Sequence, residues 1–158
     1  MKKLTVVLLL LAGLAFVGAK PASAQSFLSL NFGTITDSSF SFDPFFWTAG
    51  ATLDIYLGPH LSLSPEATMV VHNFEFGSFI LAPAVLLNVE FASLFFGGGI
   101  SKWFLLGSDI PGSPSADFSL KLNAGFKGDN LRLAAYMFTP FDNLFNSTAV
   151  GVSLGFYF

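Results

Sequence analysis

The 158-residue sequence contains no cysteine, only two histidines, and charged residues at just 11% of positions. Without cysteine the chain has no disulfide frame, so its stability must come from burial or from a surrounding membrane. A soluble domain carries about 25% charged residues because its surface faces water. The shortage of charge therefore indicates a surface that faces something other than water.

The start of the chain has the layout of a secretory signal peptide. A cationic start is followed by an apolar stretch over residues 4–17 and by small residues at 22–24. This pattern predicts cleavage after Ala24 and export through the general secretion route. A retained membrane anchor is the alternative, but Lys20 and Pro21 lead directly into the small-residue cleavage site.

Removing residues 1–24 leaves 134 residues, 25–158, which is enough for one domain. Three lysines leave with the leader, so four basic residues remain against ten acidic ones and the formal charge falls from −3 to −6. An acidic chain of this kind is a poor candidate for binding nucleic acid.

Hydrophobic residues make up 53% of the chain, including 21 phenylalanines. Their spacing along the chain predicts strands rather than helices. Residues 79–100 approach the length of a membrane helix. However, Asn88 and Glu90 lie at the middle, where a carboxylate costs about 2.5–3.5 kcal/mol, and three consecutive glycines weaken a helix further. Elsewhere apolar residues stand at every second position, as in strands of about 9–11 residues.

The alternation predicts eight strands, at residues 26–33, 46–57, 61–72, 78–87, 92–105, 117–126, 131–138 and 149–158. Short connections at 58–60, 88–91 and 127–130 are expected to separate longer ones at 34–44, 73–77, 106–116 and 139–148. An even strand count with turns on one rim and loops on the other is typical of an outer-membrane barrel. The predicted fold is all-β: an eight-stranded antiparallel transmembrane up-and-down β-barrel, porin-like, with both termini in the periplasm. Alternation is weaker over 78–105, which leaves the facing there open.

The last strand must pair with the first, because an open edge in hydrocarbon would leave backbone groups unpaired. Its pattern of Val152, Leu154, Phe156 and Phe158 resembles the C-terminal signature that the assembly machinery of bacterial outer membranes recognises. In size and strand count the chain resembles the small eight-stranded barrels of the outer-membrane protein A, X and W type. The resemblance implies a Gram-negative outer membrane as location, and outer-membrane lipid and the assembly machinery as partners.

The inward-facing positions are mostly small and polar, with five charges among them. These predicted lumen charges are Asp54, Glu66, Asp117, Lys121 and Arg132. Counting residues from each turn puts Glu66 level with Lys121, and Asp54 level with Arg132. Because buried charges need partners, we expect two cross-barrel ion pairs, Glu66 with Lys121 and Asp54 with Arg132.

The expected function is a structural role in the cell envelope, with a narrow polar lumen that is largely plugged. Resemblance to the W type implies an alternative, the binding or passage of small hydrophobic molecules, for which the phenylalanine-rich segments 42–47 and 139–145 are candidates. A membrane-interface girdle explains the same segments. A second alternative is a secreted soluble barrel that carries an apolar ligand, with its phenylalanines turned inward.

No catalytic, cofactor or dedicated metal residues are expected. Enzymatic chemistry needs a base beside a nucleophile, and the chain offers only His60 in a turn and His72 near Glu75 and Ser78 at the rim. The acidic rim could attract Ca²⁺ or Mg²⁺ loosely but has no cation-binding spacing. It comprises Asp37, Asp43, Glu75, Asp109 and Asp142.

Overall fold

The computed structural model describes residues 26–37, 45–72, 77–107, 118–144 and 148–158. The predicted signal peptide with its cleavage site at Ala24 lies outside the described residues, as does Asp117. Among the described residues, no helix has both the length and the apolar character needed to cross a membrane.

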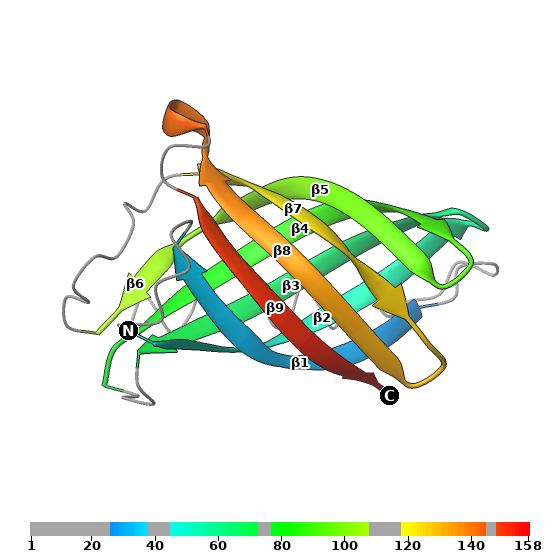
Figure 1. Cartoon of the computed structure of the whole chain (residues 1–158), viewed down its shortest axis with the longest axis horizontal. Helices are drawn as coiled ribbons and strands as arrows, with labels where there is room; N and C mark the ends of the chain where they lie inside the picture. The colour runs from blue at the N-terminus through cyan, green and yellow to red at the C-terminus, as the bar shows by residue number, and fades with distance from the viewer. Residues whose placement is uncertain (1–25, 38–44, 73–76, 108–117, 145–147) are drawn as a thin grey trace.

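The described chain forms one closed antiparallel sheet (Figure 1). Its strands are β1 (Ser26–Asp37), β2 (Phe46–Gly58), β3 (Leu61–His72), β4 (Phe79–Phe91), β5 (Leu94–Lys102), β6 (Phe104–Leu106), β7 (Phe118–Lys127), β8 (Leu131–Pro140) and β9 (Ala149–Tyr157). The order β3-β2-β1-β9-β8-β7-β5-β4 is closed by pairing of β3 with β4. Segments β5 and β6 both pair with β4 and are interrupted at Trp103, so they form one strand of the wall. The fold is therefore the predicted eight-stranded barrel.

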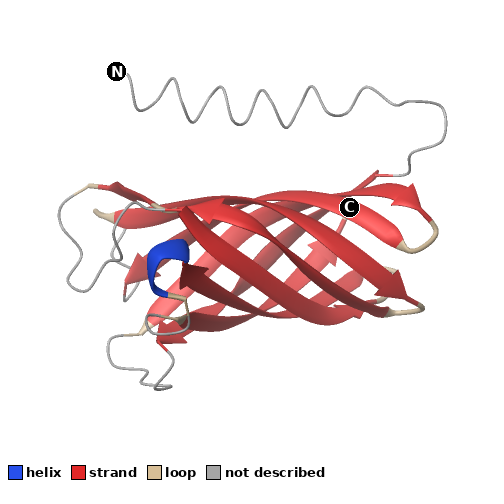
Figure 2. Cartoon of the chain, turned by 90° about the horizontal axis from the view of Figure 1, so that it is seen from above, coloured by secondary structure: helices blue, strands red, loops and turns tan. Residues whose placement is uncertain are grey.

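The two ends of the barrel differ. We call one the turn end, because it holds the tight connections at residues 59–60, 92–93 and 128–130, the start of β1 and the end of β9. At this end the Phe158 amide donates to the Leu28 carbonyl, 2.9 Å away. We call the opposite end the loop end. It holds the short helix η1 (Phe141–Asn143), which is drawn in blue in Figure 2. The same view shows the strands tilted around the barrel axis.

Side chains alternate between the outer wall and the lumen, as expected for strands. Large apolar side chains cover the outer wall, among them Phe32, Phe91, Phe96, Phe118 and Phe156. Polar side chains are buried in the lumen, among them Asp54, Ser64, Glu66, Asn88 and Lys121. A soluble barrel with an apolar ligand inside would need the reverse facing, so this alternative is wrong.

The structure corrects the predicted boundaries around the second turn. Strand β4 continues through Asn88–Phe91, which were expected to form the connection, and the turn is Ala92–Ser93. Pairing persists to the end of the strand, where Glu90 lies opposite Phe95 and its amide donates to the His60 carbonyl at 2.9 Å. Lys127, expected in the third turn, is the last residue of β7. Both shifts bring additional charged side chains into the lumen.

Candidate functional site in the barrel lumen

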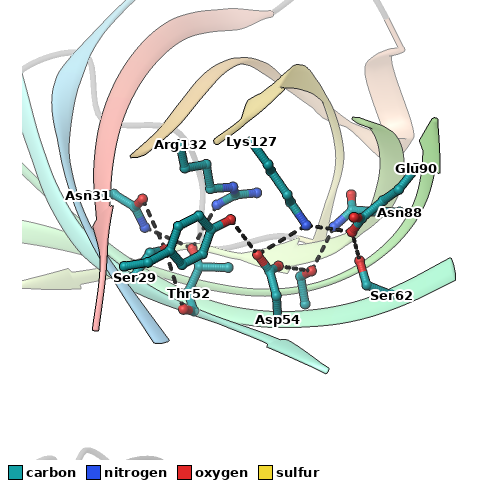
Figure 3. A network of polar contacts seen from close by, with 11 residues as sticks. Ser29, Asn31, Thr52, Asp54, Ser62, Asn88, Glu90, Lys127 and Arg132 are labelled. Atoms are coloured by element: carbon teal, nitrogen blue, oxygen red, sulfur yellow. Dashed lines mark hydrogen bonds and ion pairs between the residues drawn. The ribbon is translucent and has the colours of Figure 1, made fainter. Parts of the chain in front are cut away.

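A group of buried polar side chains lies in the lumen near the turns (Figure 3). We call it the turn-end polar network, and it comprises Asp54, Ser62, Ser64, Asn88, Glu90, Lys127 and Tyr157. Lys127 lies at its centre, with its ammonium 2.5 Å from a Glu90 carboxylate oxygen and 3.1 Å from an Asp54 carboxylate oxygen. The Lys127 side chain is 8% exposed and that of Asp54 is fully buried. One cation therefore bridges two carboxylates that come from opposite neighbours of β3.

Hydroxyl and amide donors complete this network. Asp54 accepts hydrogen bonds from the Ser64 hydroxyl at 2.5 Å and from the Tyr157 hydroxyl at 2.9 Å. Glu90 accepts one from Ser62 at 2.6 Å, and the Asn88 amide donates to the Ser64 oxygen at 2.7 Å (Figure 3). Because charges in a buried site need such partners, the network holds its ionised groups in a defined arrangement.

Arg132 extends the network across the barrel, and within the described residues it forms no ion pair. Its Nη1 donates to the Thr52 hydroxyl at 3.1 Å, and Thr52 also accepts from the Asn31 amide at 2.8 Å. The guanidinium lies 4.8 Å from the centroid of the fully buried Phe95 ring, a cation–π geometry. A Cβ placed on Gly125 would lie 2.7 Å from that ring, so glycine leaves the space that Phe95 fills.

A second charged layer lies nearer the middle of the lumen. Glu66 and Lys121 form an ion pair with both side chains buried. The Lys121 ammonium also lies 4.5 Å from the centroid of the Tyr136 ring and 4.6 Å from that of Phe138. Gly151 makes room here, since a Cβ at that position would lie 2.5 Å from Tyr136 Cζ.

Beyond this ion pair the lumen becomes apolar. We call this region the loop-end apolar cluster, which comprises Ile35, Val70, Ile80, Ala82, Trp103, Tyr136 and Phe138. The Trp103 and Phe138 rings meet edge to face with centroids 5.1 Å apart, a favourable aromatic arrangement. The prediction of a polar lumen is therefore wrong for this cluster, where Trp103 and apolar side chains from β1, β3, β4 and β8 pack together in the interior.

The predicted charge network is present in part. Glu66 and Lys121 meet as expected from counting strand positions. The predicted direct ion pair between Asp54 and Arg132 does not form among the described residues, because Asp54 contacts Lys127 and Arg132 donates to Thr52. Sequence reasoning missed Lys127 and Glu90. Their signal was the alternation itself. Asn88 and Glu90 stand two residues apart near the end of β4, and Lys127 continues the alternate positions of Lys121 and Asn123 in β7.

The remaining candidate residues lie on the outside or at the rims. Val152, Leu154, Phe156 and Phe158, the expected assembly signal, are exposed on or directly after β9. Their position on the outer wall agrees with the predicted facing of this strand.

Neither histidine lies in a catalytic arrangement within the described residues. The His60 ring lies 3.0 Å from the Glu90 carbonyl oxygen through Nδ1 and stacks on Phe91. The His72 ring lies 5.4 Å from that of Phe46. Within the described ranges, no three His, Asp or Glu side chains converge on a metal site. Three acidic rim residues fall outside these ranges, namely Asp43, Glu75 and Asp109.

The structure has a groove on its outer wall and a much smaller chamber in its lumen. A groove of about 450 Å³ lies on the outer wall, where Ala124 and Ala135 face each other between the larger Leu122, Met137 and Val152. Inside the barrel, a chamber of only about 20 Å³ lies between the two charged layers. The larger hollow thus lies on the outer wall and not between the two charged layers.

No family model matches the sequence, and neither does any curated protein. Several solved structures share its architecture, including these two. The crystal structure of Neisserial surface protein A (NspA) has 12% sequence identity and a TM-score of 0.57, covering 85% of this chain and 97% of that one. A structure from the de novo design of transmembrane beta-barrels has 9% identity and a TM-score of 0.50, covering 84% and 95%. The fold is that of a transmembrane β-barrel. At these identities the likeness concerns the fold alone.

Proposed function

We propose that the protein is an integral outer-membrane barrel with a plugged lumen and a structural role in the cell envelope. The observation that carries this proposal is the filling of the interior from both sides. The turn-end polar network occupies one part, and the loop-end apolar cluster occupies the other. A chamber of about 20 Å³ between them is too small for a solute larger than water.

The outer wall supports a membrane location. Large side chains such as Leu87, Phe96, Ile100 and Leu133 are about half exposed, and in water they would form an apolar patch far beyond that of a soluble monomer. In hydrocarbon the same wall has no such cost. Closure of β1 on β9 satisfies the backbone groups that a bilayer leaves without partners.

Two measurements test this proposal. Purified protein folded into liposomes should give no more permeation of small sugars or salts than protein-free liposomes. In cell fractionation the protein should sediment with the outer membrane and need detergent to remain monomeric. Steady conductance would contradict the plugged lumen, and a monomer stable in plain buffer would contradict the membrane assignment.

A second candidate function is the binding of small hydrophobic molecules at the loop end. The observation that favours it is the indole nitrogen of Trp103, which is buried within the apolar cluster and has no hydrogen-bond partner. A molecule with an apolar body and one polar acceptor would suit such a site.

The two tryptophans give this second candidate a direct assay. Trp47 is on the outer wall and Trp103 is in the lumen, so Trp47→Phe leaves the lumen residue as the sole indole. Titration with a long-chain alcohol should then produce a saturable change in emission. The matched control is Trp103→Phe, which reports only the wall residue. An equal change in both variants would mean partitioning into the surrounding detergent rather than binding.

A further inference from the structure

The small chamber at the middle of the lumen has unusual walls. It lies between the Glu66–Lys121 ion pair and the layer that contains Arg132, and its volume is about 20 Å³. Polar side chains from several strands line it, among them Asn31, Thr48 and Asn123. Cavities lined by hydrocarbon stay dry, whereas polar cavities of this size hold water.

Two of the lining residues have polar atoms without partners. Asn123 is only 6% exposed, and in the part of the chain that the structure describes neither its amide nitrogen nor its carbonyl oxygen has a hydrogen-bond partner. Arg132 is 3% exposed, and although its Nη1 is bonded to Thr52, its Nε has no partner. Buried donors and acceptors in folded proteins are almost always satisfied by protein or by ordered water.

We propose that the chamber is a binding site for ordered water, held by the Asn123 carboxamide and by the Nε–H of Arg132. A cavity needs about 10–15 Å³ to hold one water molecule, so the chamber has room for a single water. Such a molecule accepts a hydrogen bond from Arg132 and donates one to the Asn123 oxygen. It thereby satisfies a donor and an acceptor that the protein leaves open.

Charge balance selects a neutral ligand over an ion. The described lumen holds three carboxylates, Asp54, Glu66 and Glu90, and three cations, Lys121, Lys127 and Arg132. Adding an anion would place it beside the Glu66 carboxylate, and adding a cation would place it beside Arg132. Water avoids both repulsions and joins the two charged layers into one hydrogen-bonded column, which ends at the loop-end apolar cluster.

Nuclear magnetic resonance of the folded barrel in detergent micelles tests the site. We expect cross-relaxation between long-lived water and two groups, the Asn123 side-chain amide and the Arg132 Nε–H. Ser62 is the control, because its hydroxyl is fully buried, donates to Glu90 at 2.6 Å and does not line the chamber. Water contacts at Asn123 and Arg132 but not at the Ser62 hydroxyl would support the proposal. Their absence from Asn123 and Arg132 would overturn it.

A crystal structure and one variant complete the test. We expect a single water peak in the chamber, within hydrogen-bond distance of Arg132 Nε. An anomalous peak there after a bromide soak would overturn the proposal in favour of an anion site. Asn123→Leu fills the chamber and removes one partner, so it should abolish the water contact at Arg132. Persistence of that contact in the folded variant would contradict the role of Asn123, while the wild-type measurement stands whether or not the variant folds.

Discussion

Replacing Lys127 by methionine removes the cation that bridges two carboxylates. The ammonium lies 3.1 Å from Asp54 and 2.5 Å from Glu90. At an effective dielectric constant of about 20, a unit-charge pair at the longer of these distances attracts by about 5 kcal/mol before desolvation is subtracted. Removing one member of a buried ion pair costs about 3–5 kcal/mol, because the remaining charge stays buried without its partner. We expect Lys127→Met to lower the free energy of unfolding by this amount.

The assay is a urea titration of the barrel folded in detergent micelles, followed by tryptophan emission and by gel mobility of unheated samples. The matched control is Lys102→Met on the outer wall. Its ammonium lies 5.0 Å from the centroid of the Phe118 ring and 5.5 Å from that of Phe104. Contacts of this kind at exposed sites contribute about 0.5–1 kcal/mol, so the control should be much milder.

A second substitution separates the lost charge from lost packing. In Lys127→Met, the Glu90 carboxylate remains without a cation, so adding Glu90→Gln should restore about 1–2 kcal/mol through the coupling of the two sites. The reasoning is refuted if Lys127→Met unfolds within about 1 kcal/mol of the wild type, since a broken buried pair costs more than that. It is also refuted if Glu90→Gln restores nothing in the double variant.

Three further substitutions test a hydrogen bond of β9, the packing of the lumen and the facing of the outer wall. Tyr157→Phe removes the hydroxyl that donates to the buried Asp54 carboxylate on β2, and it should cost about 1.5 kcal/mol in the same urea titration. No loss would mean that this bond between β9 and β2 does not stabilise the barrel. Gly151→Ala puts a methyl group against the Tyr136 ring and should cost about 1–3 kcal/mol through overpacking, whereas unchanged stability would mean that the ring moves freely. Leu87→Lys, in the middle of the outer wall, should cost about 2–4 kcal/mol in a lipid bilayer, against about 0–1 kcal/mol for Leu57→Lys at the turn end. Equal costs for the two lysines would contradict a membrane-facing wall.

Much of the barrel could be predicted from the sequence, because alternation is a local property. A two-residue period determines which side chains share a face, and that was enough to orient β9 and to place Glu66 and Lys121 in the lumen. Closure followed from a physical requirement, the satisfaction of backbone groups at the first and last strands.

The turn between β4 and β5 could not be located in this way. Polar residues were assigned to the connection, although Asn88 and Glu90 belong to the polar face of the strand. The actual turn begins at Ala92, which has a φ of 54°. Glycine, asparagine and aspartate are the usual residues at such positions, so alanine gives no turn signal. Misplacing this turn also hid Glu90, the second partner of Lys127.

The partner of Asp54 and the loop-end apolar cluster depend on long-range geometry. Counting from each turn gives a level along one strand, but tilt and stagger shift neighbouring strands against one another. The long Lys127 side chain also extends from β7 to carboxylates on β2 and β4, and counting residues along a strand does not include the length of a side chain. The apolar cluster forms because Ile35, Trp103 and Phe138 meet across the barrel, and no alternation within a single strand contains that information.

The lumen holds two groups of side chains that respond to different agents, the turn-end polar network and the loop-end apolar cluster. Acid that neutralises carboxylates would weaken the contacts of Lys127 and leave the packing of Trp103 on Phe138 untouched. A solvent that loosens hydrocarbon would do the opposite. The turn-end polar network and the loop-end apolar cluster therefore respond to different agents, so that neutralising the carboxylates alone leaves the apolar cluster in place.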